Sequence, residues 1–132
     1  MKEIILSIFV PCFNEENYIT NTLNNIKEGI QTISYEILVA DDASTDKTIE
    51  MIEKFKKSNP NINIKIFRNK KNRGLGYNFW ATAHKALGKY YFILMQYSGL
   101  SLFCIFCYKA YKKIIPLELM KHFVDQIHSV LF

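Results

Sequence analysis

Two adjacent carboxylates, Asp41 and Asp42, directly follow the apolar run Tyr35–Ala40 in "YEILVADDASTD". The run has the length and composition of a buried strand, so the carboxylates come where that strand would end. Carboxylates at the end of a parallel strand can accept hydrogen bonds from ribose hydroxyl or ring N–H groups. One of the two can equally cap the next helix while the other is solvated. The pair alone does not decide between binding and structure.

A second group of candidate binding residues, Pro11, Asn14 and Glu15, follows another apolar run, Ile4–Val10. In open parallel sheets, ligands bind outside the carboxyl ends of the strands. We therefore expect the loops after the first, second and fourth apolar runs to share one rim. Acids and amides gathered at that rim predict a site that recognises a nucleoside.

The segment "NRGLGYN", Asn72–Asn78, places two glycines and Arg73 just before an expected helix, with Lys70 and Lys71 beside it. Free backbone N–H groups and the helix dipole favour an anion at such a place. A plain turn before a helix explains the same glycines, because a lone Gly-x-Gly is weak. Taken with the acids, the segment predicts a pocket that holds a nucleoside at one edge and phosphates at the other.

These candidate residues need a scaffold of alternating strands and helices. The sequence predicts strands at Ile4–Val10, Tyr35–Ala40, Ile62–Phe67 and Tyr90–Met95, with helices capped by Asn14, by Ser44 or Thr45, and at Tyr77–Leu87 closed by Gly88. Such alternation implies right-handed crossovers and a mainly parallel sheet, which is a three-layer, Rossmann-like α/β fold. The composition changes at about Gln96, so we expect a binding unit at 1–95 and a diverged segment with one amphipathic helix at 96–132.

The charge and the cysteines narrow the function classes. The net charge of +5 suits phosphate-bearing ligands, nucleic acid or an anionic membrane surface. No basic sheet studded with aromatics and no recognition helix is apparent, so nucleic acid is not expected. Three cysteines without a secretory signal favour a reduced, cytoplasmic setting. The uncharged stretch Tyr90–Tyr108 has the outline of a short membrane span, but its polar residues favour peripheral association through the Lys-rich segment.

Three segments in this order, "SIFVPCFNEENYITNTLNNI", "YEILVADDASTDKTIEMIEKF" and "NRGLGYNFWATAHKALGKYYFILM", resemble family 2 glycosyltransferases of the GT-A fold, including the dolichol-phosphate mannose synthase type. The resemblance covers Ser7 to about Met95, the nucleotide-binding half of such a domain. It implies that Pro11, Phe13 and Glu15 line the nucleotide pocket, that Asp42 and the backbone around Ala40 contact the base and ribose, and that Asp41 and Asn14 support them.

The resemblance also implies a reaction, the transfer of a sugar from a nucleoside diphosphate donor to an acceptor hydroxyl or lipid phosphate, commonly with Mg or Mn. In that family, acids at the end of the fourth strand hold the metal. Here the corresponding residues are Met95 to Gly99, which carry no negative charge and argue against tight metal binding.

The second half of such a domain does not follow, so we interpret the sequence as a truncated or diverged glycosyltransferase whose own catalysis is undecided. A catalytically inactive nucleotide-binding remnant and a membrane-associated interaction protein are the alternatives. A second copy or another partner would cover the surface left by the missing half.

Overall fold

The computed structural model describes residues 3–97 and 100–102. Strands and helices alternate along the chain, as the sequence predicts. They are β1 (Leu6–Cys12), α1 (Ile19–Gly29), β2 (Tyr35–Asp41), α2 (Thr48–Ser58), β3 (Asn63–Arg68), α3 (Leu75–Ala83), β4 (Tyr90–Ile93), β5 (Met95–Tyr97) and β6 (Leu100–Leu102). The boundaries of the first three strands differ from the predicted ones by one or two residues.

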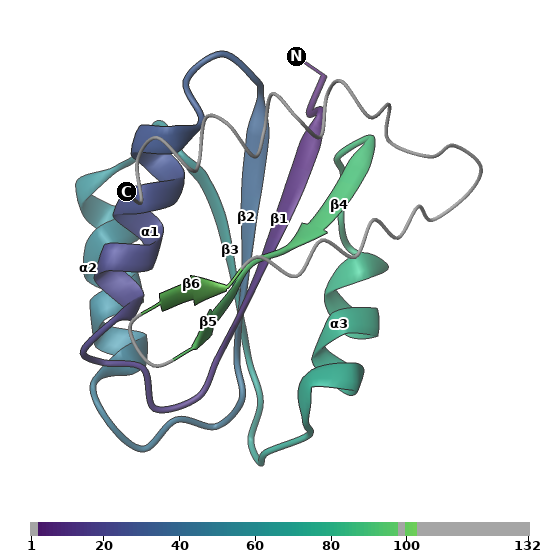
Figure 1. Ribbon diagram of the computed structural model, residues 1–132. Coiled ribbons are helices and arrows are strands. Elements are labelled where there is room, and N and C mark those ends of the chain that lie inside the picture. Colours follow the sequence, from purple (N-terminus) through teal and green to yellow (C-terminus); the bar gives the residue numbers. More distant parts are fainter. Residues whose placement is uncertain (1–2, 98–99, 103–132) are drawn as a thin grey trace.

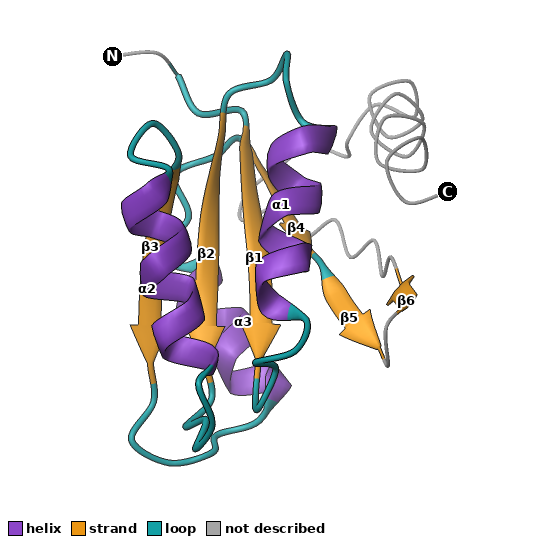
Figure 2. Cartoon of the chain, turned by 90° about the vertical axis from the view of Figure 1, so that its left-hand side faces the viewer, coloured by secondary structure: helices purple, strands orange, loops and turns teal. Residues whose placement is uncertain are grey.

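The first four strands form one parallel sheet in the order β3-β2-β1-β4. Helices α1 and α2 cover one face and α3 covers the other, which gives three layers (Figure 1). All four strands point the same way, and the loops after β1, β2 and β3 gather at their carboxyl ends (Figure 2). The predicted α/β fold is confirmed, and so is the common edge for the loops after β1 and β2.

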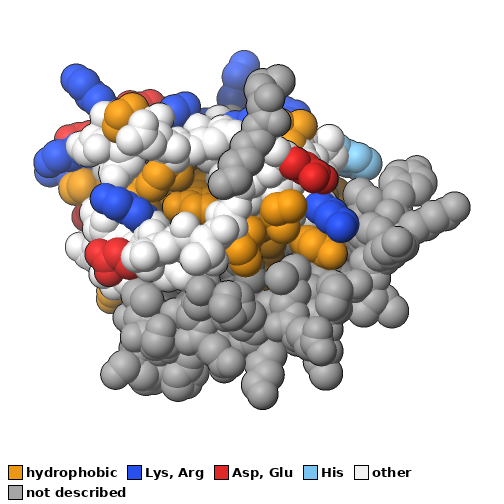
Figure 3. All heavy atoms as spheres, turned by 90° about the horizontal axis from the view of Figure 1, so that it is seen from above, with side chains coloured by type: hydrophobic (Ala, Val, Ile, Leu, Met, Phe, Trp, Pro, Cys, Tyr) orange, Lys and Arg blue, Asp and Glu red, His pale blue; other side chains and the backbone are white. Residues whose placement is uncertain are grey.

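At the amino end of the sheet, the carboxylate of Glu36 is fully buried in β2. It accepts hydrogen bonds from the Ser7 hydroxyl and the Leu87 N–H, both at 2.6 Å, and pairs with the Lys65 ammonium at 2.8 Å. Burial raises the pKa of Glu36, but the hydrogen bonds from Lys65, Ser7 and Leu87 outweigh it and hold the pKa below its ordinary value. Figure 3 looks onto this end of the molecule, where charges of both signs lie around hydrophobic side chains.

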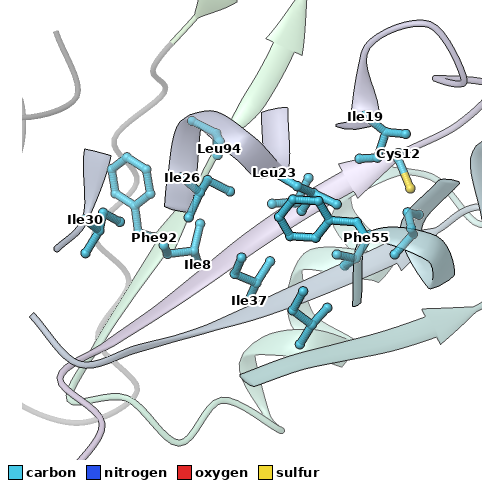
Figure 4. Packing of buried hydrophobic residues seen from close by; sticks show 14 of the residues in the cluster. Ile8, Cys12, Ile19, Leu23, Ile26, Ile30, Ile37, Phe55, Phe92 and Leu94 are labelled. Carbon is cyan, nitrogen blue, oxygen red and sulfur yellow. The ribbon is translucent and has the colours of Figure 1, made fainter. Parts of the chain in front are cut away.

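Strands β1, β2 and β4 are mostly apolar because side chains on both of their faces are buried. Toward α1 and α2, alternate strand residues such as Ile8 and Ile37 pack against Leu23, Ile26 and others (Figure 4). Toward α3, Phe9 stacks with Tyr91 at 6.1 Å between ring centroids. Complete burial of a side chain such as Leu23 stabilises the fold by roughly 2–3 kcal/mol.

Two predicted helix caps are wrong. Helix α1 begins at Ile19, not next to Asn14, because the intervening residues form a turn in which the N–H groups of Tyr18 and Ile19 donate to the Glu15 carbonyl. Helix α2 begins at Thr48, whose N–H and hydroxyl both donate to Asp46 Oδ1 at 2.9 and 2.5 Å. The side chains expected to cap these helices are used elsewhere, in contacts between the two loops.

Helix α3 begins two residues before the predicted Tyr77 and ends at Ala83, four residues before the predicted end. Gly88 therefore does not close it. The Gly88 N–H donates to the Ser7 hydroxyl at 2.8 Å, and a Cβ there would lie 2.5 Å from the Ser7 nitrogen. This glycine is required because its backbone lies against β1.

The fourth strand is shorter than predicted. Strand β4 ends at Ile93, and β5 leaves the main sheet to pair antiparallel with β6. The start of the stretch considered as a membrane span is therefore strand, and its end lies outside the described residues. No helix within residues 3–97 and 100–102 is long and apolar enough to cross a bilayer. The amphipathic helix predicted after Pro116 also lies outside the described part of the chain.

Candidate functional site

The loops after β1 and β2 are joined by hydrogen bonds at the carboxyl end of the sheet. The Asn14 N–H donates to Ser44 Oγ at 2.9 Å, and the Thr45 N–H donates to Asn14 Oδ1 at 2.9 Å. Asn14 adopts a left-handed backbone with φ 53°, which asparagine tolerates better than most residues. It thus fixes the path of both loops, which is how the structure uses a residue that the sequence assigned to a helix cap.

Glu15 lies on the same rim, beside the start of α2. Its N–H donates to Thr48 Oγ1 at 2.7 Å, and its side chain is half-buried. Burial raises the pKa of the Glu15 carboxyl, and the nearby negative charge of Asp46 raises it further. Glu15 therefore holds its proton more tightly than an exposed glutamate does.

Asp41 is fully buried at the end of β2. Its Oδ1 accepts the Ser44 N–H at 3.3 Å, and its Oδ2 lies 3.5 Å from the Arg68 Nε without a hydrogen bond from any described residue. Its neighbour across the register, Cys12, donates to the Ala40 carbonyl at 3.5 Å. Burial raises the pKa of the Cys12 thiol, and the Asp41 charge adds to this, so Cys12 is a neutral thiol and not a nucleophile.

Asp42 connects the rim to the glycine-containing loop. Its Oδ1 accepts the Asn69 side-chain amide and the Arg73 N–H, both at 2.7 Å, and its Oδ2 accepts the Gly74 N–H at 2.8 Å. Burial raises the pKa of Asp42, but the hydrogen bonds from Arg73, Asn69 and Gly74, among others, prevail and lower it. Asp42 is an ionised acceptor that holds the start of α3 against β2.

The start of α3 has the geometry that the glycines suggested. Gly74 has φ +83°, in the region that favours glycine, and it immediately precedes the helix. The first bond of the helical ladder runs from the Asn78 N–H to the Gly74 carbonyl at 3.2 Å. The N–H groups of residues 75–77 thus precede the ladder. The Arg73 guanidinium lies 4.0 Å from the centre of the Tyr77 ring.

The predicted residues occupy one end of the molecule, with different exposures. Pro11 and Ala40 face each other across the β1–β2 register, and Ala40 is buried. Phe13 is exposed at 47%. Sequence reasoning missed Asn69 and Asn78, which lie 2.7 Å apart through their amide groups beside Asp42. Asparagines are common in loops, so their identity alone gave no signal.

A divalent metal does not fit the side chains that the structure describes here. Within residues 3–97 and 100–102, no three His, Cys, Asp or Glu side chains are placed to hold one ion. Asp42 already accepts three hydrogen bonds, and Asp41 Oδ2 lies beside a cation. The described side chains of this rim therefore do not form a ligand set for Mg or Mn.

The family of the chain follows from comparison with known proteins. The model of the family described as "Glycosyl transferase family 2" matches residues 7–95. The chain belongs to this family. A similar curated relative from the family is the dolichyl N-acetyl-alpha-D-glucosaminyl phosphate 3-beta-D-2,3-diacetamido-2,3-dideoxy-beta-D-glucuronosyltransferase of Methanococcus voltae, 39% identical over 89 residues, which are 67% of this chain and 27% of that protein.

Two solved structures have the same GT-A architecture. TarS of S. aureus in complex with UDP-GlcNAc gives a TM-score of 0.61 at 29% identity, over 70% of this chain and 26% of that one. The mannosyltransferase PcManGT of Pyrobaculum calidifontis, in complex with GDP-Man and Mn2+, gives a TM-score of 0.65 at 24% identity, over 72% of this chain and 28% of that one. The chain thus spans about a quarter of the length of these proteins. The similarity to both structures supports the fold.

Proposed function

We propose that this glycosyltransferase family 2 domain binds a nucleoside diphosphate sugar at the carboxyl end of its sheet, as the donor for transfer of the sugar to an acceptor. The observation that carries the proposal is the Asp42 carboxylate, which draws three segments together at this edge. It joins the end of β2 to Asn69 and to the N–H groups that precede α3. Solved structures of similar fold with bound nucleotide sugars support it.

The base and ribose would lie against the loops after β1 and β2. Phe13 offers an exposed ring on which a base can stack, and Pro11 and Glu15 are half-buried beside it. Asp42 keeps acceptor capacity on Oδ2, which takes one N–H in the structure, so a ring N–H or ribose hydroxyl can add a hydrogen bond. The backbone at Ala40, with Asp41 and Asn14 behind it, would fix the position of Asp42.

The diphosphate would lie toward the start of α3. The N–H groups of residues 75–77 and the positive end of the helix dipole favour an anion. Arg73, Lys70 and Lys71 are exposed on the loop that leads into this helix. In the structure, the N–H groups of Arg73 and Gly74 bind the Asp42 carboxylate, so the phosphates would use the next N–H groups along the chain.

A second candidate, a domain that binds the nucleotide without turnover, is favoured by one observation. The described rim contains no group of acids suited to a metal that would neutralise the leaving diphosphate. We propose binding for residues 1–95. For the whole protein we further propose the transfer step, with a lipid as one class of acceptor. Peripheral membrane association, and a partner or second copy over residues 96–132, are also proposals for the whole protein.

Calorimetric titration with UDP and GDP, each with and without Mn, tests the proposal. The informative variant is Phe13→Ala, because its exposed ring makes little contribution to folding. We expect it to weaken binding about tenfold or more through lost stacking. Trp80→Ala is the matched control, since Trp80 is an aromatic side chain of the same 47% exposure on α3. It should leave nucleotide affinity unchanged.

Asp42→Ala should abolish binding, and its thermal unfolding must be followed in parallel, because the substitution also releases the loop before α3. Binding that is independent of Mn favours the domain without turnover. Strong enhancement by Mn would indicate acids outside the described residues. Absence of binding by either nucleotide to the folded wild-type protein would refute the proposed site.

A further inference from the structure

Acidic residues are confined to the first part of the described chain, whereas the second part carries basic residues alone. All ten acidic residues of 3–97 precede residue 54, and residues 59–97 contain none. That second part, which forms β3, α3 and β4, carries seven cations: Lys65, Arg68, Lys70, Lys71, Arg73, Lys85 and Lys89. Lys65 and Arg68 lie next to the buried carboxylates of Glu36 and Asp41. The other five are exposed.

Helix α3 lies between these five cations and has no charged residue of its own. Its inner face packs on the sheet through Asn78, Thr82 and Ala83. Tyr77 and Trp80 lie on the outer side, exposed at 46% and 47%. In Figure 1 the helix stands on the face of the sheet opposite α1 and α2.

Apolar side chains extend this outer surface at both ends of the helix. Leu75 is exposed at 43% in the first turn, and Leu87 at 64% in the segment that leads into β4. Two cations lie on the same side of the sheet as the helix. The Arg73 guanidinium is 4.0 Å from the centre of the Tyr77 ring, and Lys85 Nζ is 4.8 Å from that of Phe67, which packs in the cluster toward α3. We call this surface, made of Leu75, Tyr77, Trp80, Leu87, Lys85 and the three cations of the loop that leads into the helix, Lys70, Lys71 and Arg73, the α3 face.

We propose that the α3 face docks on the surface of an anionic lipid bilayer. Lys and Arg are attracted to anionic headgroups, and Trp and Tyr rings are favoured at the depth where headgroups meet acyl chains. Exposed Leu75 and Leu87 distinguish a bilayer from a nucleic acid, because phosphates offer leucine nothing to bury against. The charge complementarity and the exposed apolar side chains therefore select the same partner.

The only tryptophan of the chain is on this face, so its fluorescence reports docking directly. Purified full-length protein is mixed with vesicles of phosphatidylcholine containing phosphatidylglycerol, and in parallel with vesicles of phosphatidylcholine alone. We expect the Trp80 emission to shift to shorter wavelength and its quenching by iodide to fall only with the anionic vesicles. Raising the salt concentration should reverse both changes.

Charge reversal tests whether the cations of this face are responsible. Lys70→Glu combined with Lys85→Glu removes a cation at each end of α3, and we expect vesicle partitioning to fall by about tenfold or more. The matched control is Lys54→Glu with Lys57→Glu, which makes the same charge change at two exposed positions of α2. It should retain most of the partitioning.

Several results would overturn the proposal. These are an unchanged Trp80 spectrum with anionic vesicles, an equal loss in the α2 control, or retention by an RNA oligonucleotide without vesicle binding. A concentration-dependent dimer that shields Trp80 without lipid would assign the face to a second copy instead. Nucleotide titration is measured separately, so failure of docking and failure of the proposed nucleotide site are distinguishable.

Discussion

Strand β2 carries buried acids at both of its ends, and the two ends use them differently. At the amino end, Glu36 has a cation at 2.8 Å and two further donors at 2.6 Å. At the carboxyl end, Asp42 accepts N–H groups and an amide, while Asp41 has one oxygen with only Arg68 at 3.5 Å. The acidic residues in β2 and directly after it thus differ in how closely donors and cations approach their carboxylate oxygens.

The difference follows from what surrounds each end of a parallel sheet. At the amino end, Ser7, Lys65 and the turn before β4 converge on Glu36. Its Oε1 accepts two hydrogen bonds, and its Oε2 lies 2.8 Å from the Lys65 ammonium, with no other donor among the described residues. At the carboxyl end, most donors come from the loops, and the Arg68 side chain of β3 lies farther from its acid, at 3.5 Å from Asp41 Oδ2. We infer that Glu36 serves the stability of the fold, whereas the acids at the other end belong to the proposed nucleotide site.

Replacement of Glu36 should have the largest effect on stability. Glu36→Ala leaves a cavity and removes the acceptor for Ser7, Leu87 and Lys65. We expect the free energy of unfolding to fall by about 3 kcal/mol, at the lower end of the range for a broken buried pair, because Lys65 is partly exposed and can turn to water. Urea unfolding measures the loss.

Nucleotide affinity, measured on Glu36→Ala at a temperature where it is folded, should equal that of the wild type. Asp42→Ala is the counterpart, with a smaller loss of stability and a complete loss of binding. If Glu36→Ala lost nucleotide binding while folded, the assignment of separate tasks to the two ends would be wrong.

Substitutions of two glycines test the same comparison between the two ends of the sheet through the backbone. In Gly88→Ala the new Cβ would approach the backbone of Leu6 and Ser7 to between 2.5 and 2.7 Å, so β1 or the turn must move. We expect a loss of about 2 kcal/mol in urea unfolding. Gly76→Ala, in the exposed first turn of α3, meets no atom within 4 Å and should stabilise the protein by about 0.5–1 kcal/mol. Equal effects at both positions would contradict the close packing at the amino end.

Acid should reduce the stability that the carboxylates at both ends of β2 provide, by less than the substitutions of Glu36 and Gly88 do. The pKa values of Glu36 and Asp42 are lowered in the folded protein, so each contributes stability above its ordinary pKa of 4.5 or 3.8. That contribution is lost as the pH falls through the lower, folded values. The free energy of unfolding should therefore change little from neutral pH to about pH 5 and decline below about pH 4.5.

Glu36→Gln should flatten that decline, since the glutamine does not titrate. Glu53→Gln, at an exposed position of α2, is the control. A decline of the same steepness in both variants and the wild type would show that Glu36 does not contribute to acid sensitivity.

The sequence predicted the sheet well because strands buried on both faces are long apolar runs, as in Tyr35–Ala40. It predicted the common edge of the first two loops because the carboxyl ends of parallel strands coincide. Helix starts were predicted less well. Asn14 and Ser44 have the chemistry of helix caps, but they bind each other's loop, 30 residues apart in the chain. No local pattern distinguishes these two uses.

Glu36 shows what the sequence did signal. A charged residue within the apolar run "YEILVA" requires a partner, and Lys65 interrupts the apolar residues of the third strand in the same way. The pairing of these two positions depends on the strand register, which composition does not provide. A glycine after an apolar helical pattern predicts a helix end. The sequence does not predict the contact of Gly88 with Ser7 in β1, because the two residues are 81 positions apart.

The pairing of β1 with β4 has a consequence for the order of folding. Strands β1, β2 and β3 are joined by single crossovers through α1 and α2, so paired residues such as Leu6 and Tyr35 are 29 positions apart (35 − 6). On its other side, Leu6 pairs with Tyr90, the most distant partner in the sheet. During synthesis, one edge of β1 therefore stays open until β4 has emerged, with unpaired backbone groups beside apolar side chains. An interior strand of the finished sheet is thus an edge strand for most of its assembly, and that interval is when the chain is most exposed to aggregation.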